Sequence, residues 1–346
     1  MQRWNVWYGI FMEHFEIQQT GFNTRAHLGG YVPALRKFEK LASEVAGARF
    51  DMNDPVFLEK YSLEEIQADI AATKKLSQKH FQGGDAEFRP SMLAEELVKI
   101  GGKFELFGKG ATIQQTALYD DQRNNADALA RVPLEAREQD GRFLRPIVNF
   151  VLDITTDKGE RLAEKNNKLI AELRSGKLTD VKYYPGIGRG LSGVPRFVLE
   201  IDEEELVSFF EKAKTSLDGA SGINMRGFAT HYEFFSHDVC KKIISSAREQ
   251  IVYLLECAGK ATLADEIIDR AAELTEMTPN GFYKALEYID GVNADRLKIT
   301  GEDNKITVPL YLAMVKKLLM VGIAIERVLE TKEKRVSAQQ VSETLH

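Results

Sequence analysis

The order of elements expected between residues 145 and 236 constrains the fold of this chain more than any other feature of its sequence. Residues 145–155 (RPIVNFVLDIT) are rich in apolar and β-branched side chains, which predicts a buried strand. The elements expected after it are a helix at 159–176, a strand or extended turn at 178–188, a strand at 194–202, a helix at 203–217 and a strand at 226–235. This β-α-β-β-α-β order is typical of an RRM-like or ferredoxin-like sheet.

Glycines and capping residues predict the elements before this segment. The expected elements are a strand within 1–20, helices at 33–47, from 62 to the glycines at 83–84 and at 92–100, and a strand at 103–108. Ser62 and Glu65 have the spacing of a capping box, in which each residue satisfies a free N–H of the first helical turn.

Residues 109–142 are polar and irregular in pattern. Segments of this length without apolar periodicity are usually functional or mobile loops. We therefore expect this segment to leave the core and to contact a neighbouring copy or RNA, so that its removal leaves the monomer folded.

After residue 236 the apolar residues recur at helical spacing. The sequence thus predicts an α+β protein in two parts. Residues 1–236 are expected to form an RRM-like core with an inserted excursion at 109–142, and residues 237–346 a helical C-terminal region.

Charge, cysteine content and hydropathy restrict the cellular compartment and the binding partners of this protein. The formal net charge is −6, which argues against a protein held on nucleic acid by overall basicity, although a local basic groove stays possible. Cys240 and Cys257 lack metal-ligand spacing and fit a reducing compartment. The N-terminal residues lack the pattern of a signal peptide, and the apolar run at 318–325 is too short to cross a bilayer. We expect a cytoplasmic protein that does not enter a membrane.

Carboxylates follow two of the expected core strands. Asp153 and Asp157 end one strand, and Glu200 and Asp202 end another. Paired carboxylates of this kind can hold Mg²⁺ for phosphoryl transfer, and His231 could add a phosphate contact. The competing interpretation is that the acidic residues from Asp202 onward stabilise the start of a helix.

Two other groups of residues are candidates for chemistry. The glycine-rich segment 185–193 around Arg189 could bring backbone N–H groups to phosphates, or could be a plain connector. His231 and His237 lie close to acidic residues, but a zinc site needs a tighter set of ligands, so no metal or other cofactor is expected.

Basic residues in loops and at element ends form the last group. As a set they suit a groove that follows an RNA backbone, because guanidinium groups bind phosphate oxygens in pairs. The candidates are Arg25, His27, Arg36, Lys37, Lys109, Arg123, Arg131, Arg189 and Arg226.

Several segments together resemble one family. The segments are GGYVPALRKFEKLA (29–42), FELFGKG (104–110), VPRFVLEIDEEELVSFFEKA (194–213) and GASGINMRGFATHYEFF (219–235). In this order they are similar to parts of the RAMP superfamily, and most of all to the subunits that coat the guide RNA in multi-subunit CRISPR effector complexes. The resemblance covers roughly residues 5–236.

The resemblance implies an RRM-like palm, an inserted thumb or finger at 109–142, and several copies along one guide RNA. Such a protein would be a ribonucleoprotein component of antiviral defence, with single-stranded guide RNA, copies of itself and other effector subunits as partners, and no ribonuclease residue can be assigned. Two alternatives stay open. One is a metal-dependent nucleotidyl- or phosphoryl-transferase that uses Asp153, Glu200 and Asp202. The other is a structural or assembly protein that binds no nucleic acid.

Overall fold

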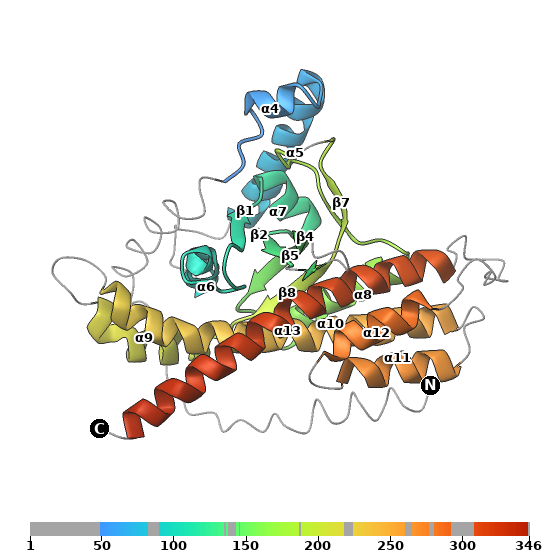
Figure 1. Cartoon of the computed structure of the whole chain (residues 1–346). Helices are drawn as coiled ribbons and strands as arrows, with labels where there is room; N and C mark the ends of the chain where they lie inside the picture. The colour runs from blue at the N-terminus through green and yellow to red at the C-terminus, as the bar shows by residue number, and fades with distance from the viewer. Residues whose placement is uncertain are drawn as a thin grey trace.

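The computed structural model describes residues 49–81, 90–134, 136–137, 143–144, 146–186, 188–217, 224–259, 265–276, 280–291 and 308–344. The expectations for a strand within 1–20 and a helix at 33–47 lie outside these residues. The chain folds into a mixed α+β structure in which a small sheet is packed against long helices (Figure 1).

A four-stranded mixed sheet lies at the centre. Its strands are β1 (Thr112–Gln115), β2 (Ala128–Pro133), β5 (Ile147–Thr155) and β8 (Arg196–Glu200), and they are adjacent in this order. The pairs β1–β2 and β2–β5 are antiparallel, whereas β5 and β8 are parallel. Helix α8 (Glu160–Arg174) connects β5 to the hairpin of β6 (Thr179–Val181) and β7 (Leu191–Val194), which leads into β8.

Helices surround this sheet. Along the chain they are α4 (Pro55–Leu58), α5 (Leu63–Phe81), α6 (Pro90–Lys99), the 3₁₀ turn η1 (Ile100–Gly102), α7 (Leu118–Asn124), α9 (Glu203–Leu217), α10 (Met225–Gly259), α11 (Asp265–Glu276), α12 (Gly281–Asp290) and α13 (Val308–Thr344). The expected helices from residue 62 and at 92–100 are confirmed as α5 and α6. The Glu65 N–H donates to Ser62 Oγ over 3.2 Å, as the capping pattern predicts.

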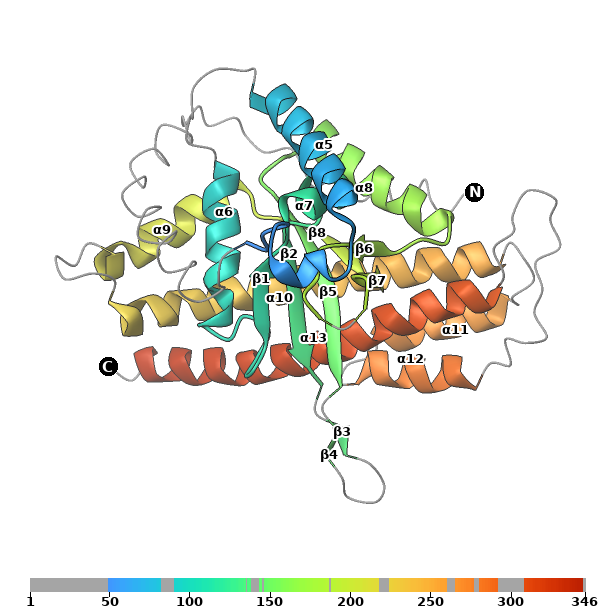
Figure 2. The same ribbon diagram turned by 90° about the horizontal axis from the view of Figure 1, so that it is seen from above.

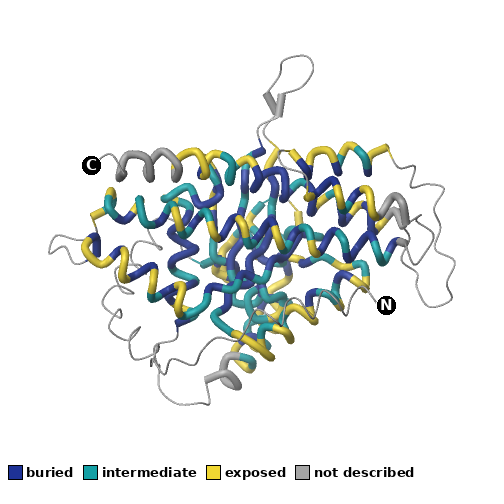
Figure 3. Tube along the Cα trace, turned by 90° about the horizontal axis from the view of Figure 1, so that it is seen from below, coloured by how far each residue is buried: buried dark blue, intermediate teal, exposed yellow. Residues whose placement is uncertain are grey.

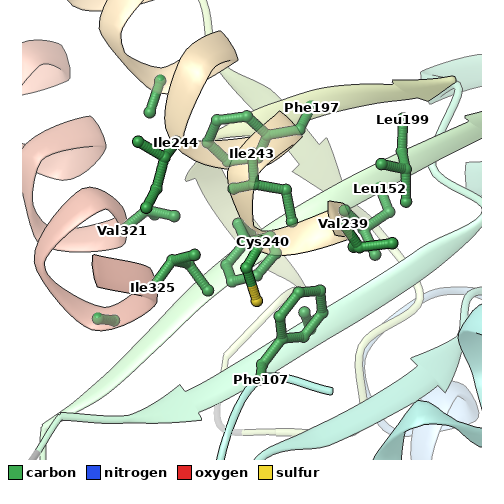
Figure 4. Packing of buried hydrophobic residues seen from close by; sticks show 14 of the residues in the cluster. Phe107, Leu152, Phe197, Leu199, Val239, Cys240, Ile243, Ile244, Val321 and Ile325 are labelled. Carbon is green, nitrogen blue, oxygen red and sulfur yellow. The ribbon is translucent and has the colours of Figure 1, made fainter. Parts of the chain in front are cut away.

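One face of the sheet is apolar. Register places Ile113, Ala130 and Phe150 in one row across β1, β2 and β5. Helices α10 and α13 pack on this face, with Cys240 and Ile243 from α10 and Ile325 from α13 beside the sheet residues (Figure 4). Buried positions accordingly concentrate in the middle of the body, and exposed ones follow the outer faces of the helices (Figure 3).

The fourth strand expected at 226–235 is wrong, because these residues belong to α10. Phe228, Tyr232 and Phe235 recur at spacings of four and three, which places them on one side of a helix, where they pack with Phe104 and Phe209. Helix α10 also runs without a break across residue 236, where the sequence suggested the end of the core. The described residues after 237 are otherwise helical, as expected.

The expectation that residues 109–142 leave the core is also wrong. Strands β1 and β2 both lie in this segment, and β2 is an inner strand of the sheet. Ala128, Leu129 and Ala130 are fully buried. Among the described residues of this segment, only the hairpin of β3 (Ala136–Arg137) and β4 (Phe143–Leu144) stands away from the body (Figure 2). We call residues 135–145 the arm.

The strand expected at 103–108 is a turn instead. Glu105 and Gly108 both have positive φ values, 54° and 86°, which no strand accommodates. Leu106 and Phe107 from this turn are buried under the apolar face of the sheet. The apolar residues of this segment therefore serve packing without forming a strand.

Candidate nucleic-acid interface

The second face of the sheet carries a row of polar side chains. Thr112 lies opposite Arg131, and Arg131 lies opposite Asn149, so the three residues point to the same side of three neighbouring strands. Thr112 is exposed, and Arg131 and Asn149 are half-buried. We call these three residues the polar row. Gln114, also half-buried, lies two positions along β1 on the same side.

A second row on this face is covered. Leu129 and Val151 are fully buried against Val181 and Val194 of the β6–β7 hairpin. Tyr184, which follows β6, reaches back so that its ring lies 5.8 Å from the Arg131 guanidinium. The polar row therefore lies at the edge of this cover, with an aromatic ring beside it.

Two atoms of the polar row lack hydrogen bonds. Arg131 Nε and Asn149 Oδ1 are buried from solvent, and neither has a hydrogen-bond partner within the described part of the chain. Buried polar atoms are nearly always paired, so this unpaired donor and acceptor on adjacent strands leave the hydrogen bonding of the polar row incomplete.

The β6–β7 connection is held against the α4–α5 turn by a cluster of tyrosines around Lys182. Lys182 Nζ lies 5.0 Å from the centre of the Tyr61 ring, 5.3 Å from that of Tyr119 and 5.6 Å from that of Tyr183. The same atom is 2.6 Å from Asp69 Oδ2. This ammonium group is fully engaged, so Lys182 fixes the loop and is not offered to a ligand.

Hydrogen bonds to Asp120 set the direction of this loop. Its carboxylate accepts from the backbone N–H groups of Lys182 and Tyr183 over 2.8 and 2.9 Å. Burial raises the pKa of Asp120, and these two hydrogen bonds act in the opposite direction. Burial and the hydrogen bond to Asp69 raise the pKa of Tyr183, so this phenol stays protonated at physiological pH. Tyr184 is thereby held next to the polar row.

The glycine-rich segment is ordered by contacts with the α4–α5 turn. Lys60 Nζ donates to the carbonyls of Tyr184 and Gly186, and Arg189 Nε donates to the Lys60 carbonyl over 2.8 Å. Gly190 has a φ of 98°, and a Cβ atom there would lie 2.7 Å from the Val181 carbonyl oxygen. The segment is therefore a tight connector, from which the Arg189 side chain emerges 71% exposed beside the Tyr61 ring.

Two of the nine basic candidates lie over aromatic rings. Arg131 lies over the ring of Tyr184 in the tyrosine-rich loop (Lys182, Tyr183 and Tyr184), and Arg189 lies over the ring of Tyr61 between α4 and α5. Lys109 is exposed in the turn before β1, and Arg123 and Arg226 are exposed near the C-terminus of α7 and the N-terminus of α10. Arg25, His27, Arg36 and Lys37 lie outside the described residues.

The strand-end carboxylates are engaged elsewhere. Asp153 is buried and lies 3.0 Å from Lys165 Nζ and 3.9 Å from Arg196 Nη1. Asp202 accepts from the Glu205 N–H over 2.8 Å, and Glu205 accepts from the Asp202 N–H over 3.0 Å. These two hydrogen bonds cap the N-terminus of α9. They agree with the interpretation that the acidic residues from Asp202 onward stabilise the start of a helix.

Glu200, His231 and His237 are the remaining candidates for a metal site or a phosphate contact. Burial raises the pKa of Glu200, and the nearby Lys242 opposes that effect. His237 lies 3.3 Å from Asp238, and His231 lines a groove between α9 and α10. Within the described residues, no group of three or more His, Cys, Asp or Glu side chains could hold a metal ion.

Sequence reasoning missed Thr112, Asn149 and Tyr184. The alternation in ALARVP (128–133) and the two aromatic residues before Pro185 were the available signals. Neither signal reveals that the three strands pair in a register that aligns these residues.

Comparisons with known proteins add no relative: no family model matches the chain, and no curated protein or solved structure matches it. No helix in the described part of the chain is long and apolar enough to cross a membrane.

Proposed function

We propose that this protein binds single-stranded RNA across the polar row and the neighbouring tyrosine-rich loop, as an RNA-coating subunit of a CRISPR effector complex. The observation that carries the proposal is the alignment of Thr112, Arg131 and Asn149 on one sheet face, with Tyr184 beside them. Single-stranded RNA is bound by aromatic rings that stack on bases together with cations and polar groups that contact the backbone.

Each part of this surface has a role in the proposal. Arg131 donates from its half-buried guanidinium group to a phosphate or base oxygen, and Asn149 contacts a base or a ribose hydroxyl through its half-buried amide. Arg189, whose guanidinium lies over the Tyr61 ring and is 71% exposed, neutralises another phosphate of the strand. The surface has only a few cations, which is compatible with the net charge of −6.

The RRM-like feature that we propose is that RNA binds on one face of the β-sheet. RNA would lie on the face that is turned away from α10 and α13, as in modules that display bases on a sheet. The likeness does not extend to the strand order, since β5 and β8 are parallel neighbours and residues 226–235 are helical. Copies of the chain and other effector subunits in the cytoplasm are the proposed partners.

The test is RNA affinity measured by fluorescence anisotropy with a labelled single-stranded oligonucleotide. We expect Arg131→Gln and Arg189→Glu each to raise the dissociation constant by about tenfold, because each removes a charge-assisted hydrogen bond worth about 1.5 kcal/mol. Each variant should also reduce the slope of log K against log salt by about 0.7, the single-strand value for one phosphate.

Lys241→Glu is the matched control, because Lys241 is exposed on α10, on the opposite side of the sheet. It should bind RNA with nearly unchanged affinity and salt slope. If both arginine variants bind RNA as the wild type does, RNA does not lie on this face. Failure of the wild-type protein to bind RNA, together with a protein-only absorbance ratio at 260 and 280 nm after purification, would favour an assembly protein without nucleic acid.

A further inference from the structure

A groove between α9 and α10 lies apart from the proposed RNA surface. It has a volume of about 630 Å³, and its apolar part is formed by Phe209, Phe234 and Phe235. Phe234 lines the groove and is 37% exposed. Grooves between helices with an aromatic base commonly receive an apolar segment of a partner.

The rim of the groove is acidic. Asp202, Glu204, Glu205 and Asp238 line it, against Lys212 and Lys242. Lys242 is already paired with Glu205 at 2.6 Å. The side chain of Asp238 is 68% exposed, and Glu204 is also exposed. A segment with apolar residues between cations would complement this surface in both shape and charge.

The arm of the same chain has this pattern. Its second half reads Arg142-Phe143-Leu144-Arg145, with two apolar residues between two guanidinium groups. The strands of the arm extend beyond the ends of β2 and β5, away from the body (Figure 2). Helix α9 lies at a different side of the molecule in both views (Figures 1 and 2). Strands β3 and β4 therefore lie outside the groove of their own copy.

We propose that the arm of one copy binds in the α9–α10 groove of the next copy. Phe143 and Leu144 contact the aromatic base, while Arg142 and Arg145 face the carboxylates of the rim. Because the two surfaces differ, the contact is head-to-tail and can repeat along a row of copies. This extends the proposed function, in which copies lie side by side on RNA, but the contact itself requires no RNA.

The test uses two double variants, one with a defective groove and one with a defective arm. Phe234→Ala with Glu204→Lys damages the groove, and Arg142→Glu with Arg145→Glu damages the arm. In sedimentation velocity without RNA, the wild-type chain should form a concentration-dependent series larger than a dimer. Each variant alone should be monomeric at concentrations where the wild type assembles, with the dissociation constant raised at least about tenfold.

Mixing the two variants distinguishes this contact from any other. The intact arm of the groove variant can enter the intact groove of the arm variant, so an equimolar mixture should form dimers and nothing larger. Tyr283→Ala is the control, because Tyr283 is 45% exposed on α12 and should be dispensable for assembly. A far-UV circular dichroism spectrum equal to that of the wild type excludes misfolding of either variant.

A wild-type chain that stays monomeric, variants that assemble like the wild type, or a mixture that stays monomeric would each overturn the inference. Binding of a short single-stranded RNA by each variant separates this result from the proposed function. Normal RNA binding without assembly contradicts only the head-to-tail contact, and normal assembly without RNA binding contradicts only the RNA-coating function.

Discussion

Deletion of residues 115–138 is expected to abolish folding, whereas replacement of residues 136–144 by a short glycine-containing turn should leave the fold intact. The first change removes β2, which pairs with β1 on one side and β5 on the other. It also removes the buried side chains of Leu129, Ala130 and Val132 from both faces of the sheet. The loss exceeds the total stability of about 5–15 kcal/mol that a typical domain has.

The second change removes only the outer part of the arm. Its strands pair with each other through Ala136–Leu144 and Arg137–Phe143. Urea unfolding followed by far-UV circular dichroism measures both variants. We expect no cooperative transition for the first and a wild-type midpoint, within about 0.5 kcal/mol, for the second. A folded 115–138 deletion would mean that β2 is not an inner strand of the sheet.

Arg196→Met is expected to destabilise the protein by about 3–5 kcal/mol, the range for breaking a buried ion pair by removing one partner. The Arg196 side chain is only 1% exposed, and its Nη2 donates to Glu172 Oε2 over 2.8 Å. Its Nη1 donates to the Asn124 carbonyl over 3.2 Å and lies 3.9 Å from Asp153. Without the guanidinium, Lys165 is the one cation that still pairs with the buried Asp153 carboxylate among the described residues.

Two comparisons isolate the cause. Glu172→Gln should cost less than about 1 kcal/mol, because the Glu172 side chain is 32% exposed and water can replace its partner. Adding Asp153→Asn to Arg196→Met should recover part of the lost stability, since the buried group that has lost one of its two cations is then neutral. Urea midpoints give all three values. If the double variant is no more stable than Arg196→Met, the loss is due to packing and not to charge.

The sequence predicted the elements whose signals are local. Helices α5, α6, α8 and α9 have clear caps or glycine ends, and β5 and β8 are rich in apolar side chains. The first part of α10 was misread because its aromatic residues have high strand propensity, although the spacing of Phe228, Tyr232 and Phe235 fits a helix. Strands β1 and β2 are short and lie between polar residues, so their burial depends on partners far along the chain.

In the candidate site, too, local signals were visible in the sequence, whereas contacts between distant parts of the chain were not. Arg131 and Arg189 were recognisable as isolated basic residues, but their positions depend on separate contacts with the rings of Tyr184 and Tyr61. Thr112 and Asn149 have no chemical signal in the sequence, since only the pairing of β1, β2 and β5 aligns them. The acidic pair Asp202 and Glu205 was predictable as a cap because capping depends on a spacing of three residues.

Photo-cross-linking tests the central claim most directly. A single-stranded RNA that contains 4-thiouridine is bound to the wild-type protein, irradiated and digested, and the linked peptides are identified by mass spectrometry. The RNA-coating proposal predicts cross-links in the peptides that hold the polar row and Tyr184, and their loss in Arg131→Gln. Cross-links confined to α10 and α13, on the other side of the sheet, would contradict it.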